Sequence, residues 1–98
     1  MSDRLSLDSF APLVGQTFIG KSSNGFSAEL ELTEAVSITA HANQPRQDPF
    51  SLLFRVAAES GLWQGTLRIE HPEFGSAELF LVPVGEDQKG RYFEALFN

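Results

Sequence analysis

The stretch 63-WQGTLRIEHPEFGSAELFLVPVGEDQKGRYFEALFN-98 predicts three consecutive strands joined by two turns. Apolar and polar side chains alternate in its first and last parts, and a period of two residues is typical of a strand with one wet face. We expect a turn at Pro72 to Gly75 and a second loop over Gly85 to Gly90. The segment is therefore predicted to form an antiparallel meander up to the C-terminus.

The middle strand of this meander has apolar residues on both faces in its LFLVPV run. Such a run is typical of a strand that is covered on both sides. We therefore expect Leu79 and Leu81, and also Phe80 and Val82, to be largely buried. Pro83 has no backbone N–H to donate, so it should lie near a strand end, a sheet edge or a bulge.

Further strands are predicted on either side of the polar loop AHANQPRQDP at 40–49. Before that loop, Asn24-Gly25 favours a tight hairpin turn. Apolar and polar residues alternate strictly in the segment FSAELELT that follows this turn. The alternation of the apolar residues continues through Val36 and Ile38 on the same face as Leu30 and Leu32 but is broken by Glu34. A bend or bulge is therefore expected near Thr33 to Ala35. After the loop, FSLLFRVA alternates again.

The segment LDSFAPLVG at 7–15 predicts a short helix over one end of the core. Asp8 or Ser9 can cap this helix, Pro12 is tolerated in its first turn, and Gly15 favours its C-terminal end. Its expected apolar face comprises three residues: Phe10, Leu13 and Val14.

These elements predict a mainly β fold, a six-stranded antiparallel small barrel or sandwich with one short N-terminal helix. We expect a single domain over residues 1–98, with 1–6 as a flexible tail. Strand order does not follow from one sequence.

Thirteen acidic and seven basic residues give a net charge of -6, and the bases are scattered. This disfavours nucleic acid and anionic membranes as partners.

No run approaches the ~18 apolar residues of a membrane span, and the N-terminal segment lacks the apolar stretch of a signal peptide. We therefore expect a cytoplasmic protein without membrane insertion. The absence of cysteine rules out disulfides and thiol nucleophiles.

The sequence predicts no metal, cofactor-binding or catalytic residues. A zinc site would need both histidines, His41 and His71, plus a carboxylate such as Asp48, Glu70 or Glu73, and no H-x-H or H-x-x-x-H spacing occurs. His71 is instead expected to hydrogen-bond the turn backbone beside Pro72.

Other catalytic patterns are also missing, because the chain contains neither a G-x-S-x-G elbow nor a phosphate-binding glycine pattern. Glu94 is the most interesting acid, since apolar and aromatic residues flank it in RYFEALF. Glu94 lies two residues from Tyr92 and therefore on the same face of the strand, however, and this face can point to solvent beside a basic neighbouring strand. We therefore expect that the protein is not an enzyme.

The best candidate for a partner anchor is the pair Leu62 and Trp63 in ESGLWQG, residues 59–65. Tryptophan is enriched among interface hot spots. Its alternative use is to close the end of the core, which would make Trp63 partly buried.

Four stretches, SFAPLVGQTF, WQGTLRIEHPEFG, LFLVPVG and YFEALFN, together resemble a family of small bacterial domains of unknown function. The likeness spans nearly the whole chain and carries no catalytic residue. It implies an association with phage-tail-like collar genes, and hence an accessory role in a tail-like or surface assembly.

The leading hypothesis is a non-enzymatic protein-interaction or assembly module whose acidic exterior suits a basic protein partner. The alternative is a small-ligand-binding barrel lined by some of the nine phenylalanines. An enzyme of unidentified class is the third hypothesis.

Overall fold

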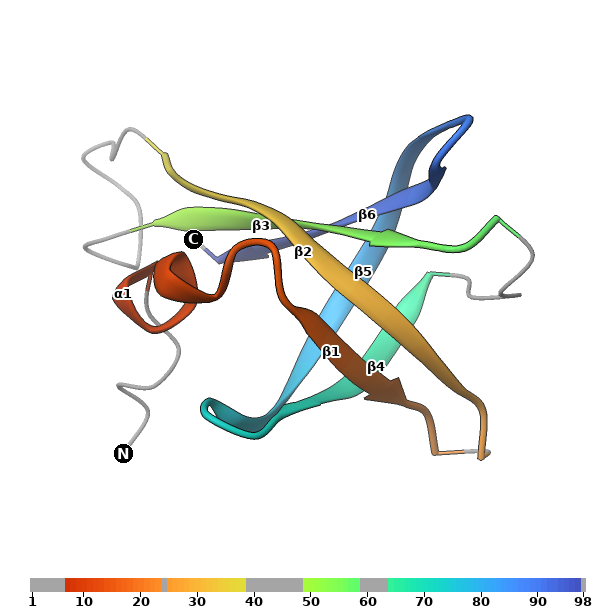
Figure 1. The fold of residues 1–98 in the computed structure, drawn as a ribbon, viewed down its shortest axis with the longest axis horizontal. Helices are drawn as coiled ribbons and strands as arrows, with labels where there is room; N and C mark the ends of the chain where they lie inside the picture. The colour runs from red at the N-terminus through yellow and green to blue at the C-terminus, as the bar shows by residue number, and fades with distance from the viewer. Residues whose placement is uncertain (1–6, 24, 39–48, 59–63, 98) are drawn as a thin grey trace.

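Six antiparallel strands close into a barrel in the computed structural model, which describes residues 7–23, 25–38, 49–58 and 64–97 (Figure 1). The strand order around the barrel is β1-β2-β3-β6-β5-β4. The mainly β prediction is confirmed, and of its two forms the barrel is correct. The strand bounds are β1 Thr17–Lys21, β2 Ser27–Ser37, β3 Phe50–Val56, β4 Gly65–His71, β5 Gly75–Asp87 and β6 Gly90–Phe97.

The barrel consists of two three-stranded meanders that join along two seams. Strands β1 to β3 pair in sequence, and strands β4 to β6 form the predicted C-terminal meander. One seam pairs all of β3 with residues 91–97 of β6, and the other joins β1 to β4 through the three residues from Ile19 to Lys21. These seams bring together strands that are distant in the chain.

Period-two alternation places one side chain in two inside the barrel. Strand β3 shows this most clearly, because Phe50, Leu52, Phe54 and Val56 are all buried. The buried apolar set comprises Phe10, Leu13, Phe18, Leu30, Leu32, Phe50, Leu52, Phe54, Val56, Leu67, Ile69, Phe74, Leu79, Leu81, Phe93 and Ala95.

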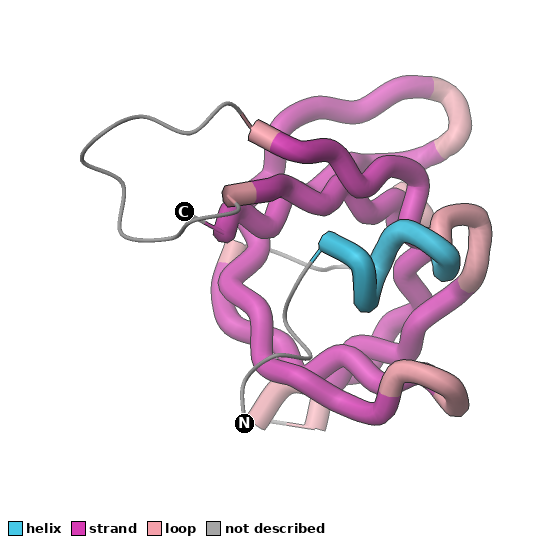
Figure 2. The backbone as a smooth tube through the Cα atoms, turned by 90° about the vertical axis from the view of Figure 1, so that its left-hand side faces the viewer, coloured by secondary structure: helices cyan, strands magenta, loops and turns pink. Residues whose placement is uncertain are grey.

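A short helical segment lies over one end of the barrel, as predicted (Figure 2). It consists of α1, Leu7–Phe10, and a single 3₁₀ turn, η2, Ala11–Leu13. Because α1 begins at Leu7, Asp8 and Ser9 lie inside it and not at its cap. Phe10 and Leu13 are buried, but Val14 is 43% exposed. The prediction for Val14 was wrong because its backbone is already extended and leads away from the helix.

The predicted bulge lies in β2 and changes which residues face the core. Leu32 pairs with Phe54, but Glu34 pairs with Leu53, so Thr33 is one extra residue on the β2 side. An extra residue reverses the alternation that follows it. Val36 is therefore outside and 44% exposed, contrary to prediction.

Strand β5 is covered on only one face. Leu79 and Leu81 are buried as predicted, whereas Phe80 is 54% exposed and Val82 is 37% exposed. The two-sided burial prediction was wrong because the interior of a closed barrel contacts only one face of each strand. The expectation for Pro83 is confirmed, because the pairing of β5 with β6 shifts register between Pro83 and Gly85.

We expect Leu81→Ala to lower the free energy of unfolding by about 2–5 kcal/mol. Leu81 is fully buried, so truncation removes apolar contacts and leaves a cavity. Phe80→Ala on the same strand should lower the free energy of unfolding much less, because more than half of Phe80 is already exposed to water. Urea unfolding of both variants measures the difference. A Leu81→Ala loss below about 1 kcal/mol would contradict this placement of the core.

Candidate functional site

The HPEFG segment forms the predicted hairpin connection, since β4 ends at His71 and β5 begins at Gly75. His71 is 8% exposed, and its Nδ1 accepts a hydrogen bond of 3.0 Å from the backbone N–H of Glu73. Its Nε2 lies 2.7 Å from Oε1 of Gln16. Because Nδ1 accepts, Nε2 carries the proton and donates to Gln16.

Both ring nitrogens of His71 are therefore engaged, and the ring also packs 4.9 Å from that of Phe18. Neither nitrogen is available as a general base or a metal ligand without breaking a hydrogen bond. The predicted structural use of His71 is confirmed. Among the described residues there is no group of three or more potential metal-ligating side chains. The other histidine, His41, lies outside the described residues, as does Asp48.

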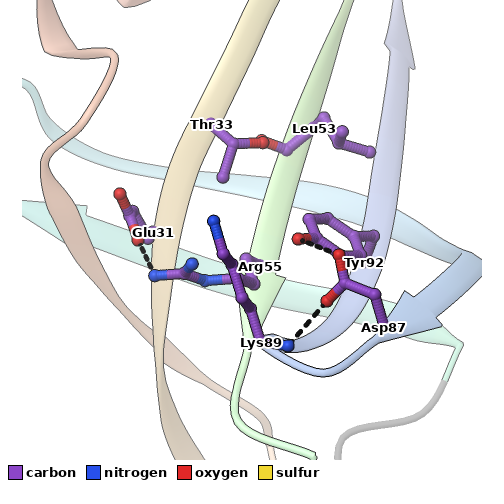
Figure 3. Close-up of polar contacts among 7 residues, drawn as sticks. All are labelled: Glu31, Thr33, Leu53, Arg55, Asp87, Lys89 and Tyr92. Atoms are coloured by element: carbon purple, nitrogen blue, oxygen red, sulfur yellow. Dashed lines mark hydrogen bonds and ion pairs between the residues drawn. The ribbon is translucent and has the colours of Figure 1, made fainter.

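A second polar region lies on the outside of the barrel, on β2, β3 and β6 and at the β5–β6 turn (Figure 3). Arg55 on β3 forms an ion pair and hydrogen bond with Glu31 on β2. At the turn, Asp87 accepts hydrogen bonds from the backbone N–H of Lys89 at 2.8 Å and from the hydroxyl of Tyr92 at 2.9 Å. These contacts connect neighbouring strands and close the hairpin.

The hydrogen bonds to Asp87 shift the pKa values of Asp87 and of Tyr92. The Lys89 backbone N–H and the Tyr92 hydroxyl stabilise the carboxylate and lower the pKa of Asp87. Donation to this carboxylate raises the pKa of Tyr92, because ionisation would remove the hydrogen bond and bring two negative charges together. The largest cause of each shift is a hydrogen bond within the hairpin, so this cluster stabilises the turn.

Tyr92 should ionise above the ordinary tyrosine pKa of about 10 in the wild-type protein, and Asp87→Asn should return it toward that value. The only tyrosine in the chain is Tyr92, so the ultraviolet absorbance of tyrosinate reports this group alone. The stabilisation from the hydrogen bond is present below the unfolded pKa and is lost as the pH rises through the folded pKa. Identical titration curves for the two proteins would contradict the contact.

The third region is an apolar surface on the outer face of β3, β6 and β5, which we call the outer apolar patch. It consists of Leu53, Phe80, Val82 and Leu96. Phe80 is 54% exposed, Leu96 is 53% exposed and Val82 is 37% exposed. A surface groove crosses β5 and β6 at this point, and it is lined by Glu78, Leu79, Phe80, Val82, Glu94, Ala95, Leu96 and Phe97.

Glu94 lies within the outer apolar patch. In the pairing register it is opposite Leu53 on β3 and opposite Val82 on β5. Its side chain is half-buried. Of the expected basic neighbouring strand, the structure shows one base: Arg55 lies on the same outer face of β3, opposite Tyr92, but it is ion-paired with Glu31, and the two residues directly opposite Glu94 are apolar.

The patch departs from the ordinary alternation of an exposed antiparallel strand, in which outward residues are polar. Grouped exposed apolar side chains mark interaction sites more often than single ones do. The sequence signal was the two-sided apolar run of β5, which we interpreted as burial. The anchor predicted at Leu62 and Trp63 lies outside the described residues.

Fold and surface together define a small closed antiparallel β-barrel domain with a buried apolar core and the outer apolar patch. Residues 5–97 match the family model of the domain of unknown function DUF6916, so the chain belongs to that family. The resemblance to a family of domains of unknown function is thus confirmed. Comparisons with curated proteins and with solved structures found no match. Within the described part of the chain, no helix has the length and apolarity to cross a membrane.

Proposed function

We propose that this domain is a non-enzymatic protein-interaction module that binds its partner through the outer apolar patch. The observation that carries the proposal is the exposure of Phe80 and Leu96, each more than half in water, around one groove on β5 and β6. Burying such side chains against a partner contributes about 25 cal/mol for each Å² of apolar surface removed from water. The same surface would serve the accessory role in a tail-like or surface assembly that the resemblance implies.

The barrel supports this function by holding the patch in place. The patch residues lie on paired strands, so little backbone order has to be gained on binding. The side chains on the opposite face of β3 and β6 are core residues, among them Phe54 and Phe93. Binding to the patch therefore needs no change in the interior.

The packing of the phenylalanines favours protein binding over the small-ligand alternative. Five of the nine rings have no exposed surface: Phe10, Phe18, Phe50, Phe54 and Phe93. Rings packed against one another in this way serve as the core of a small domain, and little of their surface is left to line a ligand cavity. Phe80, by contrast, is available at the surface.

Site-specific photocrosslinking in the cells that produce the protein tests the proposal. Benzoylphenylalanine at position 80 should give a discrete protein adduct, whereas the same group at position 19 on β1 should not. Ile19 is a matched control because it is also outward-facing, is 37% exposed, and lies on a strand that is not adjacent to β5 or β6.

The adduct should be lost when Leu96→Ser is added and retained when Val14→Ser is added, since Val14 is also an exposed apolar residue but lies at the helical segment. The melting temperature of Leu96→Ser should be unchanged because that side chain is outside the core. Equal adducts at positions 80 and 19, or an adduct that survives Leu96→Ser, would overturn the proposal.

A further inference from the structure

We propose that Glu94 selects a partner segment that carries a lysine or arginine beside bulky apolar side chains. This inference rests on the proposed function of the outer apolar patch and specifies the chemistry of its partner. It follows from the position of one carboxylate, the absence of a cation beside it in the described structure, and the charges around the groove.

The position of Glu94 is unusual for an acid on a barrel exterior. Leu53 and Val82 flank it across the sheet, and Leu96 follows it on the same face of β6. Its side chain is half withdrawn from water, which weakens the solvation of the carboxylate. A cationic partner group placed against it would restore a favourable interaction in a medium of lower dielectric than water.

No side chain of the described residues supplies that cation. The ion pairs in this part of the chain join Lys21 to Glu70, Arg55 to Glu31 and Arg91 to Glu86. The carboxylate of Glu94 takes part in none of them, and no hydrogen bond to it is formed within the described residues. An interface that covered Glu94 with apolar groups alone would leave a buried unpaired charge, which is costly.

The charges within the groove are acidic, and the two nearest bases in the register already face acids, since Arg68 on β4 is opposite Glu78 and Arg55 on β3 is ion-paired with Glu31. The groove contains two charged residues, Glu78 and Glu94, and both are acidic. Glu34 on β2 lies in the same row across the sheet, since it pairs with Leu53, which in turn pairs with Glu94. The net charge of the chain is -6. Two copies of this chain would bring like charges together at the patch, so a basic partner segment is the better complement.

The spacing of the patch sets the form of that segment. Glu94 and Leu96 are two residues apart on one strand, which places them roughly 6.6 Å apart. An extended peptide presents alternate side chains on one face at the same interval. A segment in which apolar residues occur two positions before and two positions after an arginine can therefore place its arginine at Glu94, one apolar side chain at Leu96 and the other at Tyr92, which lies two residues before Glu94 on the same face of β6.

A pair of synthetic peptides tests this inference directly. The first is acetyl-GLSRSLG-amide, and the second carries citrulline in place of arginine, which keeps the shape and removes the charge. Each is titrated into ¹⁵N-labelled protein at low salt, and the amide shifts of β5 and β6 give the site and the affinity. We expect the arginine peptide to bind about fivefold more tightly than the citrulline peptide.

The preference should disappear in Glu94→Gln and remain in the matched control Glu29→Gln, which removes an exposed acid from β2. Equal affinity for both peptides in the wild-type protein would overturn the inference, as would a preference that survives Glu94→Gln or a lack of β5 and β6 shifts with either peptide. These outcomes are distinct from a failure of the proposed function, which the crosslinking at position 80 measures without reference to charge.

Discussion

Phe10→Ala should lower the free energy of unfolding by about 3–5 kcal/mol, one of the largest effects expected for a single substitution in this chain. Phe10 has no exposed surface, although it belongs to a helix of only four residues. Its ring centroid lies 4.8 Å from that of Phe74, 6.1 Å from that of Phe50 and 6.2 Å from that of Phe97. Truncation would leave these three rings around a cavity at the end of the barrel.

Val14→Ala is the matched control for this prediction. Val14 follows the same helical segment but is 43% exposed, so its truncation should change stability by less than about 1 kcal/mol. Urea unfolding monitored by circular dichroism measures both variants. Equal losses in the two variants would mean that the helical segment docks loosely and that Phe10 does not close the barrel.

Gly90→Ala should destabilise the protein by about 3 kcal/mol or more, because this position combines strained backbone with a close approach of two strands. Gly90 begins β6 with a φ of 149°, a conformation that residues with a side chain rarely adopt. A Cβ atom here would lie 2.2 Å from the carbonyl oxygen of Val56 at the end of β3. Relief of that clash requires the β3–β6 seam to open at this end.

Gly85→Ala provides the comparison within the same pair of strands. A Cβ atom at Gly85 would meet no other atom within 4 Å, and its φ is not positive. Its effect on the free energy of unfolding should therefore stay within about 0.5 kcal/mol. Thermal or urea unfolding of the two glycine variants measures this difference. A Gly90→Ala protein as stable as Gly85→Ala would contradict the close approach of Gly90 to Val56 at the β3–β6 seam.

The outer apolar patch illustrates how sequence and structure differ in what they reveal about function. The LFLVPV run was recognisable in the sequence as apolar on both faces. Its meaning changed once the barrel was known, because a closed sheet covers only the inner face of each strand. Phe80 and Val82 thereby changed from expected core residues into the centre of the candidate binding surface. Glu94 gained its significance in the same way, from neighbours on two other strands.

The local features of this protein could be predicted from the sequence alone. The alternation in FSLLFRV placed four residues of β3 in the core, the break at Glu34 located the bulge, and HPEFG marked the β4–β5 turn. These features depend on residues close in the chain, through the period of two of a strand and the backbone preferences of Gly and Pro.

The closure of the barrel, and which side chains that closure buries, could not be predicted from the sequence. The β1–β4 and β3–β6 seams pair residues far apart in the chain, and no local pattern specifies which strands will meet. The bulge in β2 then turned Val36 outward, and closure left Phe80 and Leu96 in water. Burial depends on what packs against a side chain, whereas periodicity shows only which side chains share a face.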